Sequence, residues 1–147
     1  MADVPSAIAF FGNQRRYAKL ATKRTGREVI ITSNVKGDGN DIKVNYHSLI
    51  NRGYRYFENS TIMLLNLLKK VGPKKITIAG FDGFNEKAEK NYSDDSFQND
   101  RHVSEFAVLN AEVSQMFSEI VETLYPNCTV EMITPSVYEE ALKKVKQ

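Results

Sequence analysis

The chain has 147 residues, of which 41% are apolar and 26% are charged, and its formal net charge is +2. This length and composition suit a single domain, residues 1–147, with a sizeable core, and they argue against unusual classes of protein. Cys128 is the only cysteine and cannot form an internal disulfide, and no apolar run is long enough to cross a bilayer. We therefore expect a cytoplasmic protein with no membrane partner.

Charge is distributed unevenly along the chain. Residues 1–75 contain 14 Lys or Arg and 5 Asp or Glu, whereas residues 76–147 contain 6 and 13. The basic half could attract an anionic ligand, although pairing with the acidic half within the fold is the simpler interpretation. No recognised nucleic-acid motif accompanies the basic residues, so we expect no nucleic-acid partner.

Strand-like and helix-like patterns alternate in the first part of the chain. The apolar run Ala7–Phe11 ends in Gly12-Asn13, and Gln14–Lys23 has apolar residues at helical spacing. A second β-branched run covers Arg27–Thr32, and the alternation in Ile42–Tyr46 predicts a short third strand. The sequence therefore predicts a strand, a helix and two further strands in residues 7–46.

A helix and a strand are predicted next. Asn59–Val71 is apolar nearly all round, as expected of a helix that is covered on several sides. Asn59 or Ser60 would cap its first turn, and Gly72-Pro73 would end it. The run Ile76–Ala79 then predicts a central strand of a sheet.

The remaining segments complete an α/β pattern. Phe81–Arg101 is a polar excursion, and the spacing of apolar residues predicts a long amphipathic helix from Phe106 to Leu124. Thr129–Ile133 predicts a last strand, and a terminal helix would run from Pro135 to about Lys146. We expect a Rossmann-like three-layer α/β/α sandwich with a mainly parallel sheet of about five strands.

Candidate ligand contacts follow the predicted strands. In a parallel sheet the loops after the strands emerge at one edge, where ligands bind. Asn13 and Asn34 could contact ribose hydroxyls or base edges, Ser60 could help a helix start to hold an anion, and Asp82, after Gly80, could accept hydrogen bonds from a sugar. Each residue alone also fits a turn or cap, so the prediction depends on their convergence.

Other chemistry has little support in the sequence. The only histidines, His47 and His102, have no Cys or His neighbours at ligand spacing, so we predict no metal site. No Walker loop or complete Gly-x-Gly-x-x-Gly motif is present. His102 could act as a general base if the polar excursion folds over the strand ends.

Two family resemblances sharpen these expectations. Asn59-Ser60-Thr61 before an apolar helix, with the run from Gly72 to Phe84, resembles the C-terminal extension of some bacterial 4-hydroxy-2-oxovalerate aldolase or HMG-CoA lyase-like proteins. The resemblance covers residues 9 to about 138 and implies an accessory domain excised from a longer chain, with an aldolase-like catalytic domain in cis. The family's lyase activity resides in a metal-dependent (β/α)₈ barrel, for which 147 residues are too few, so the resemblance implies no cofactor in this chain.

More distantly, Phe10-Phe11-Gly12-Asn13-Gln14, Val29–Asn34 and Gly80-Phe81-Asp82 are similar to segments of the bacterial sialyltransferases that use CMP-sialic acid. This resemblance implies that the five candidates bind a nucleotide sugar and that His102 is the catalytic base; the five are Asn13, Asn34, Ser60, Gly80 and Asp82. The chain departs from that family because no Gly-Asn-Gly-Pro-Ser phosphate loop precedes residue 7.

Three functions therefore stand as expectations. The first is an accessory domain that binds a nucleotide-like or anionic small molecule at the strand ends. The second is a glycosyltransferase acting on a nucleotide sugar of the CMP-sialic acid type. The third is a docking or oligomerisation domain without a ligand, which would form a homo-oligomer.

Overall fold

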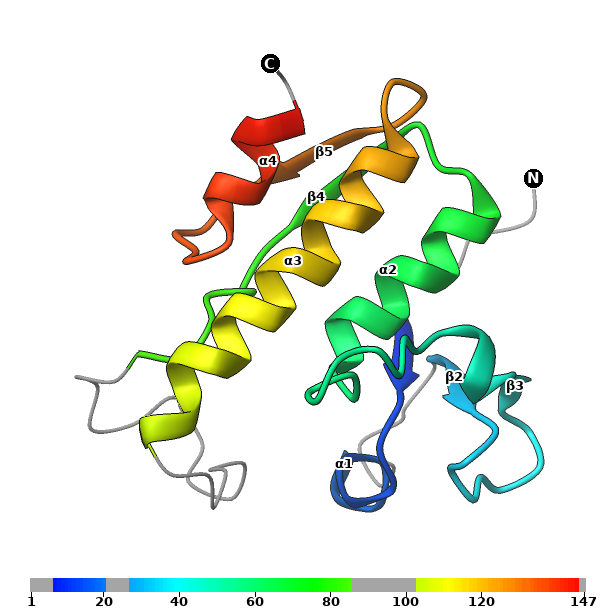
Figure 1. The fold of residues 1–147 in the computed structure, drawn as a ribbon. Coiled ribbons are helices and arrows are strands. Elements are labelled where there is room, and N and C mark those ends of the chain that lie inside the picture. The colour runs from blue at the N-terminus through cyan, green and yellow to red at the C-terminus, as the bar shows by residue number, and fades with distance from the viewer. Residues whose placement is uncertain (1–6, 21–26, 86–102, 146–147) are drawn as a thin grey trace.

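The computed structural model describes residues 7–20, 27–85 and 103–145, and the structural statements below concern these residues (Figure 1). They form a mixed α/β protein in which paired strands run parallel. No helix in these ranges is long and apolar enough to cross a membrane. In chain order the elements are β1 (Ile8–Phe11), α1 (Gln14–Leu20), β2 (Glu28–Thr32), β3 (Ile42–Val44), the 3₁₀ helix η2 (Tyr46–Ser48), α2 (Ser60–Val71), β4 (Lys75–Ile78), the 3₁₀ helix η4 (Val103–Glu105), α3 (Phe106–Leu124), β5 (Thr129–Met132) and α4 (Glu139–Val145).

The five strands belong to two sheets, where the sequence pattern predicted one. β2 lies between β1 and β3, and Phe11 of β1 is opposite Ile31 of β2. β4 pairs with β5, and Ile76 is opposite Val130. Five parallel strands are thus present, but β1 and β4 share no hydrogen-bonded ladder within the described ranges.

Helices pack against both faces of the first sheet, because side chains along a strand alternate in direction. Phe11 packs edge to face with Tyr17 of α1, with ring centroids 5.5 Å apart, in a cluster that includes Val29 and Ile31. Phe10 points the other way and packs against the cluster that contains Met63 of α2.

The second sheet has one buried face and one open face. Ile76 and Ile78 are buried in the largest hydrophobic cluster, with residues of α3 and α4. On the opposite face Lys75 Nζ lies 2.7 Å from Glu131 Oε1, and the Thr77 hydroxyl donates to the same oxygen at 2.9 Å. The strand expected to be central is therefore half-exposed, and the alternation of polar and apolar residues within it explains why.

The ends of α2 confirm the sequence prediction. Asn59 is the N-cap, and its Oδ1 accepts hydrogen bonds from the amides of Thr61 and Ile62 at 3.0 and 3.1 Å. Gly72 ends the helix in the left-handed conformation, with φ of 73°.

α2 contributes to the cores of both sheets. Ile62 and Leu65 are buried in the cluster that covers the second sheet, whereas Met63 belongs to the cluster that covers one face of the first. Figure 1 shows α2 between the strands of the first sheet and the long helix α3.

The long helix α3 is also confirmed, with its limits as predicted. The apolar residues that marked it are all buried; they are Phe106, Leu109, Val113, Met116, Phe117, Ile120 and Leu124. The largest cluster includes all of them except Phe106, so the periodicity of the sequence identified the core face correctly.

Two other elements differ in extent from the prediction. The third strand ends at Val44, because the Asn45 side chain caps η2 instead of extending the ladder. The terminal helix begins at Glu139, because the Ser136 hydroxyl donates to Phe81 O at 2.5 Å and holds its own segment in a turn. Residues 21–23 of the first predicted helix and most of the polar excursion lie outside the described ranges.

Candidate functional site

The ends of β1 and β2 are joined by side-chain hydrogen bonds. Thr32, whose exposed fraction is 0%, donates from its hydroxyl to Asn34 Oδ1 at 2.5 Å and lies 3.4 Å from Phe11 O. Asn34 Nδ2 in turn donates to Gly12 O at 3.4 Å. Asn34 is therefore fixed beside the end of β1, with its side chain at the surface.

Gly12 allows the amino end of α2 to approach β1 closely. A Cβ atom at Gly12 would lie 2.7 Å from Met63 Sδ and 3.6 Å from Ser60 Oγ. Because Asn59 fills the capping position, the Ser60 hydroxyl has no capping role, and it makes no hydrogen bond within the described ranges. The structure thus brings Ser60 to the strand end that carries Gly12.

Asn13 has a structural role of its own. Its Oδ1 accepts hydrogen bonds from the amides of Arg15 and Arg16 at 2.9 and 3.3 Å, which is the pattern of an N-cap. Its Nδ2 remains available at the exposed surface. Asn13, Asn34 and Ser60 therefore all lie around Gly12, and we call these four residues the β1 group.

Gly80 and Asp82 lie in a second group, after β4. The Gly80 amide donates to Thr134 Oγ1 at 2.9 Å, and the Thr134 hydroxyl lies 3.4 Å from Asp82 Oδ1. The Val137 amide donates to Asp82 O at 3.1 Å, so the backbone is held while the carboxylate side chain is exposed. Gly80 has a φ of 69°, a conformation that other residues rarely adopt.

Asn110 holds the far side of this loop, a role that the sequence did not reveal. Its Oδ1 accepts from the Phe84 amide at 3.0 Å and its Nδ2 donates to Phe84 O at 2.7 Å. The hydroxyl of Tyr138 donates to the same Oδ1 at 3.0 Å. The ring of Phe84 also stacks on Phe106, with centroids 5.0 Å apart. In the sequence, only the position of Asn110 beside the apolar stripe of α3 indicated that its side chain is partly buried.

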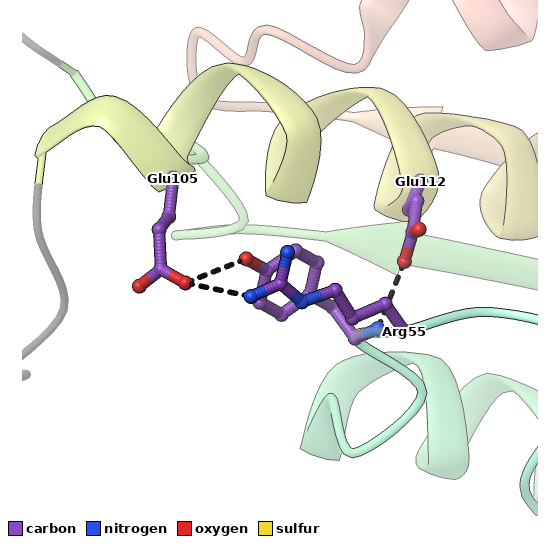
Figure 2. Close-up of polar contacts among 4 residues, drawn as sticks. Arg55, Glu105 and Glu112 are labelled. Carbon is purple, nitrogen blue, oxygen red and sulfur yellow. Dashed lines mark hydrogen bonds and ion pairs between the residues drawn. The ribbon is translucent and has the colours of Figure 1, made fainter.

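A polar cluster connects the segment before α2 to α3 (Figure 2). Glu105 Oε1 accepts from the Tyr56 hydroxyl at 3.0 Å and lies 3.2 Å from Arg55 Nη2. Glu112 Oε2 accepts from the Tyr56 amide at 2.8 Å, and the Arg55 guanidinium lies 5.2 Å from the centre of the Tyr56 ring. Each carboxylate of the cluster accepts a hydrogen bond from the segment before α2, which indicates a role in holding the two segments together.

Charge pairing across the two halves of the chain is present as well. Arg55 with Glu105 and Lys75 with Glu131 each join the basic half to the acidic half. Both ion pairs have exposed partners and contribute little to stability individually. They support the simpler of the two interpretations of the uneven charge.

The structure therefore brings some candidates together and leaves others apart. The β1 group meets around one strand end, whereas Gly80 and Asp82 meet Thr134 at the end of the second sheet, and no described hydrogen bond links the two groups. His102 lies outside the described ranges. Among the residues that are described, no three His, Cys, Asp or Glu side chains could hold a metal ion.

The fold defines a mixed α/β protein with parallel strands and polar side chains at their carboxyl ends. Comparison of the chain with protein-family models, with curated proteins and with solved structures found no match. The residues themselves carry the functional argument.

Proposed function

We propose that this chain is an accessory domain of an aldolase-like protein and that it binds a nucleotide-like or anionic small molecule at its strand ends. The observation that carries the binding proposal is the meeting of the β1 group, where two strand ends and the first turn of α2 come together. The accessory role rests on the sequence resemblance alone.

The finer fold belongs to the same proposal. We infer a Rossmann-like three-layer arrangement, because β3-β2-β1 and β4-β5 are the two halves of the strand order 3-2-1-4-5. The coverage of both faces of the first sheet, by α1 and by α2, supports this inference. In such folds ligands bind where the two halves meet, beyond the carboxyl end of the first strand. In the inferred arrangement Gly12 would occupy that place.

The available groups suit an anion with hydroxyls attached. Asn59 accepts the amides of Thr61, Ile62 and Met63, so in the first turn of α2 the Ser60 amide is the one without a described acceptor, and the Ser60 hydroxyl adds a second donor beside it. Asn13 and Asn34 add side-chain amide donors, which carry no charge. Asp82 would accept hydrogen bonds from sugar hydroxyls if the ligand reaches the second group.

Thermal unfolding with a ligand panel tests the proposal. The panel consists of CMP, a CMP-sugar, a UDP-sugar and simple organic acids. A ligand at about 100 times its Kd would stabilise the protein by about 2.7 kcal/mol, which raises the melting temperature by several degrees. Ser60→Ala should reduce the shift, whereas Ser118→Ala, on the surface of α3, should leave it unchanged.

The outcomes separate the three functions. If no ligand in the panel changes the melting temperature, the binding proposal is wrong and a docking or oligomerisation role gains support. If Asp82→Ala binds normally while Ser60→Ala does not, the site is confined to the β1 group. The glycosyltransferase alternative would additionally require turnover of a CMP-sugar that His102→Ala abolishes.

A further inference from the structure

Tyr46 and Glu58 form a hydrogen-bonded pair close to the first turn of α2. Tyr46 is the first residue of η2, and its hydroxyl donates to Glu58 Oε1 at 2.5 Å. Tyr46 is buried, with an exposed fraction of 9%, whereas Glu58 is exposed at the surface. The buried tyrosine therefore holds an exposed carboxylate in a defined orientation.

The neighbours of this pair, in the chain and across hydrogen bonds, belong to the β1 group. Glu58 comes two residues before Ser60, so their Cα atoms are at most about 7 Å apart. The Tyr46 amide donates to Ser33 Oγ at 3.1 Å, and Ser33 is the residue before Asn34. The pair is thus tied both to the amino end of α2 and to the carboxyl end of β2.

The packing beneath the pair leads to the same strand end. Tyr46 is buried in the cluster that contains Met63 of α2. A Cβ atom at Gly12 would lie 2.7 Å from Met63 Sδ, so Met63 packs beneath the end of β1 as well. Met63 therefore supports both Gly12 and Tyr46, and Glu58 lies at the rim of the strand-end site.

The Glu58 carboxylate keeps most of its capacity to accept hydrogen bonds. An ionised carboxylate has about four lone-pair positions, and within the described ranges the Tyr46 hydroxyl is the only donor to it. Burial, and then the hydrogen bond to Glu58, raise the pKa of Tyr46 to about 12, so the hydroxyl stays protonated at neutral pH and remains a donor. Glu58 can therefore accept at least two further hydrogen bonds from a ligand.

A neutral hydroxyl group suits this carboxylate better than an ammonium group. The positive charge of Arg52 opposes the rise in the pKa of Tyr46, which indicates that the guanidinium lies on the side of the Tyr46 hydroxyl. The negative charge of Glu58 is therefore partly balanced already, and a further cation at this exposed position would gain little. A hydroxyl group needs only an acceptor, which the free lone pairs of Glu58 supply.

We propose that Glu58 extends the strand-end site and selects a ligand with two adjacent hydroxyl groups, as in the ribose of a ribonucleoside phosphate. This inference rests on the binding site of the proposed function and names its ligand class. The phosphate is bound by the Ser60 amide and hydroxyl beside Gly12, and the two ribose hydroxyls donate to Glu58. A 2′-deoxyribose lacks one of these hydroxyls and loses one charge-assisted hydrogen bond.

Isothermal titration calorimetry with matched nucleotides tests this proposal. The probes are CMP with 2′-deoxy-CMP and AMP with 2′-deoxy-AMP, so each pair differs by one hydroxyl group. We expect the deoxynucleotide of each pair to bind about tenfold more weakly, because a hydrogen bond to a charged group contributes about that factor in affinity. The ratio should be similar for both bases, because Glu58 contacts the ribose.

Matched variants assign the discrimination to Glu58. Glu58→Met removes the acceptor and should bring the ratio of the two affinities close to one, whereas Glu122→Met, the same change at an exposed position of α3, should leave the ratio unchanged. Tyr46→Phe keeps the ring in its cluster but releases the carboxylate, so it should reduce the ratio without abolishing it. Because both nucleotides are measured on the same variant, a general loss of folded protein would not alter the ratio.

Equal affinities of the wild type for both members of each pair would overturn the role of Glu58 and leave the strand-end site intact. A tenfold ratio that persists in Glu58→Met would overturn it as well. If none of the four nucleotides binds, this inference is wrong, whereas the proposed function still stands if a simple organic acid raises the melting temperature.

Discussion

Replacement of Asn110 by alanine is expected to destabilise the protein more than its partial exposure suggests. The side chain makes three hydrogen bonds, two with the backbone of Phe84 and one with the hydroxyl of Tyr138. Tyr138 is buried, with an exposed fraction of 1%, so its hydroxyl cannot turn to water freely. Asn110→Ala removes all three bonds at once.

The expected magnitude follows from a comparison with a second asparagine. A hydrogen bond of this kind contributes about 1 kcal/mol net, so Asn110→Ala loses about 3 kcal/mol from its three bonds. Asn66 lies in α2 and makes one described bond, from Nδ2 to Leu49 O at 3.0 Å, so Asn66→Ala loses about 1 kcal/mol. Both changes gain a similar helix propensity, which cancels in the comparison. The two variants should therefore differ by about 2 kcal/mol.

Urea unfolding of the wild type and both variants measures this difference, and circular dichroism at 222 nm reports the transition. At this chain length a difference of about 2 kcal/mol corresponds to about 4–8 °C in melting temperature. Tyr138→Phe should cost less in the Asn110→Ala background than in the wild type, because the hydroxyl has already lost the Asn110 acceptor. Equal unfolding free energies for the Asn110 and Asn66 variants would refute the reasoning.

Two further predictions concern backbone conformation and ionisation. Gly83→Ala should lower the melting temperature more than Gly39→Ala, because both have positive φ, 87° and 91°, but only at Gly83 would the new Cβ lie 2.3 Å from Val137 Cγ2. Burial, and then a hydrogen bond to a glutamate, raise the pKa of Tyr46 and of Tyr54 to about 12, from 10.0. The unfolded chain therefore loses these two protons at lower pH than the folded protein does, so the free energy of unfolding should fall as pH rises from about 10 to 12. Changing both tyrosines to phenylalanine should reduce this pH dependence in urea unfolding measured across that range. An unchanged pH dependence would contradict the prediction.

Local patterns in the sequence were sufficient to predict most of the helices and strands. The spacing of apolar residues in α3 identified its buried face, and Asn59 and Gly72 marked the ends of α2 through their capping preferences. These signals are local, because each depends on residues within one or two turns.

The pairing of strands was not predictable in the same way. The run Ile76–Ala79 is apolar enough for a central strand, but pairing depends on residues far along the chain. Lys75 and Thr77 alternate with isoleucines, and this pattern correctly signals a sheet with one exposed face. The polar side chains of Lys75 and Thr77 are thus the feature of the sequence that indicates a second sheet exposed on one side.

The candidate site shows the same division. The loop that carries Asp82 was recognisable from its glycines, whereas the contact between Gly12 and the first turns of α2 requires tertiary packing. The sequence left open whether Asn13 binds a ligand or belongs to a turn or cap, and in the structure its side chain caps α1. The anchoring by Asn110 depends on two residues, Phe84 and Tyr138, that lie 26 and 28 positions away in the chain.

The placement of α2 has a consequence for cooperativity. The helix supplies Ile62 and Leu65 to one cluster and Met63 to another, so melting of either half would expose one side of the same helix to water. Within the described ranges the two sheets share no ladder, and α2 provides a physical connection through which the loss of one core weakens the other. Slow amide exchange should therefore persist longest in α2, and the two halves should unfold in a single transition, although they are built from separate sheets.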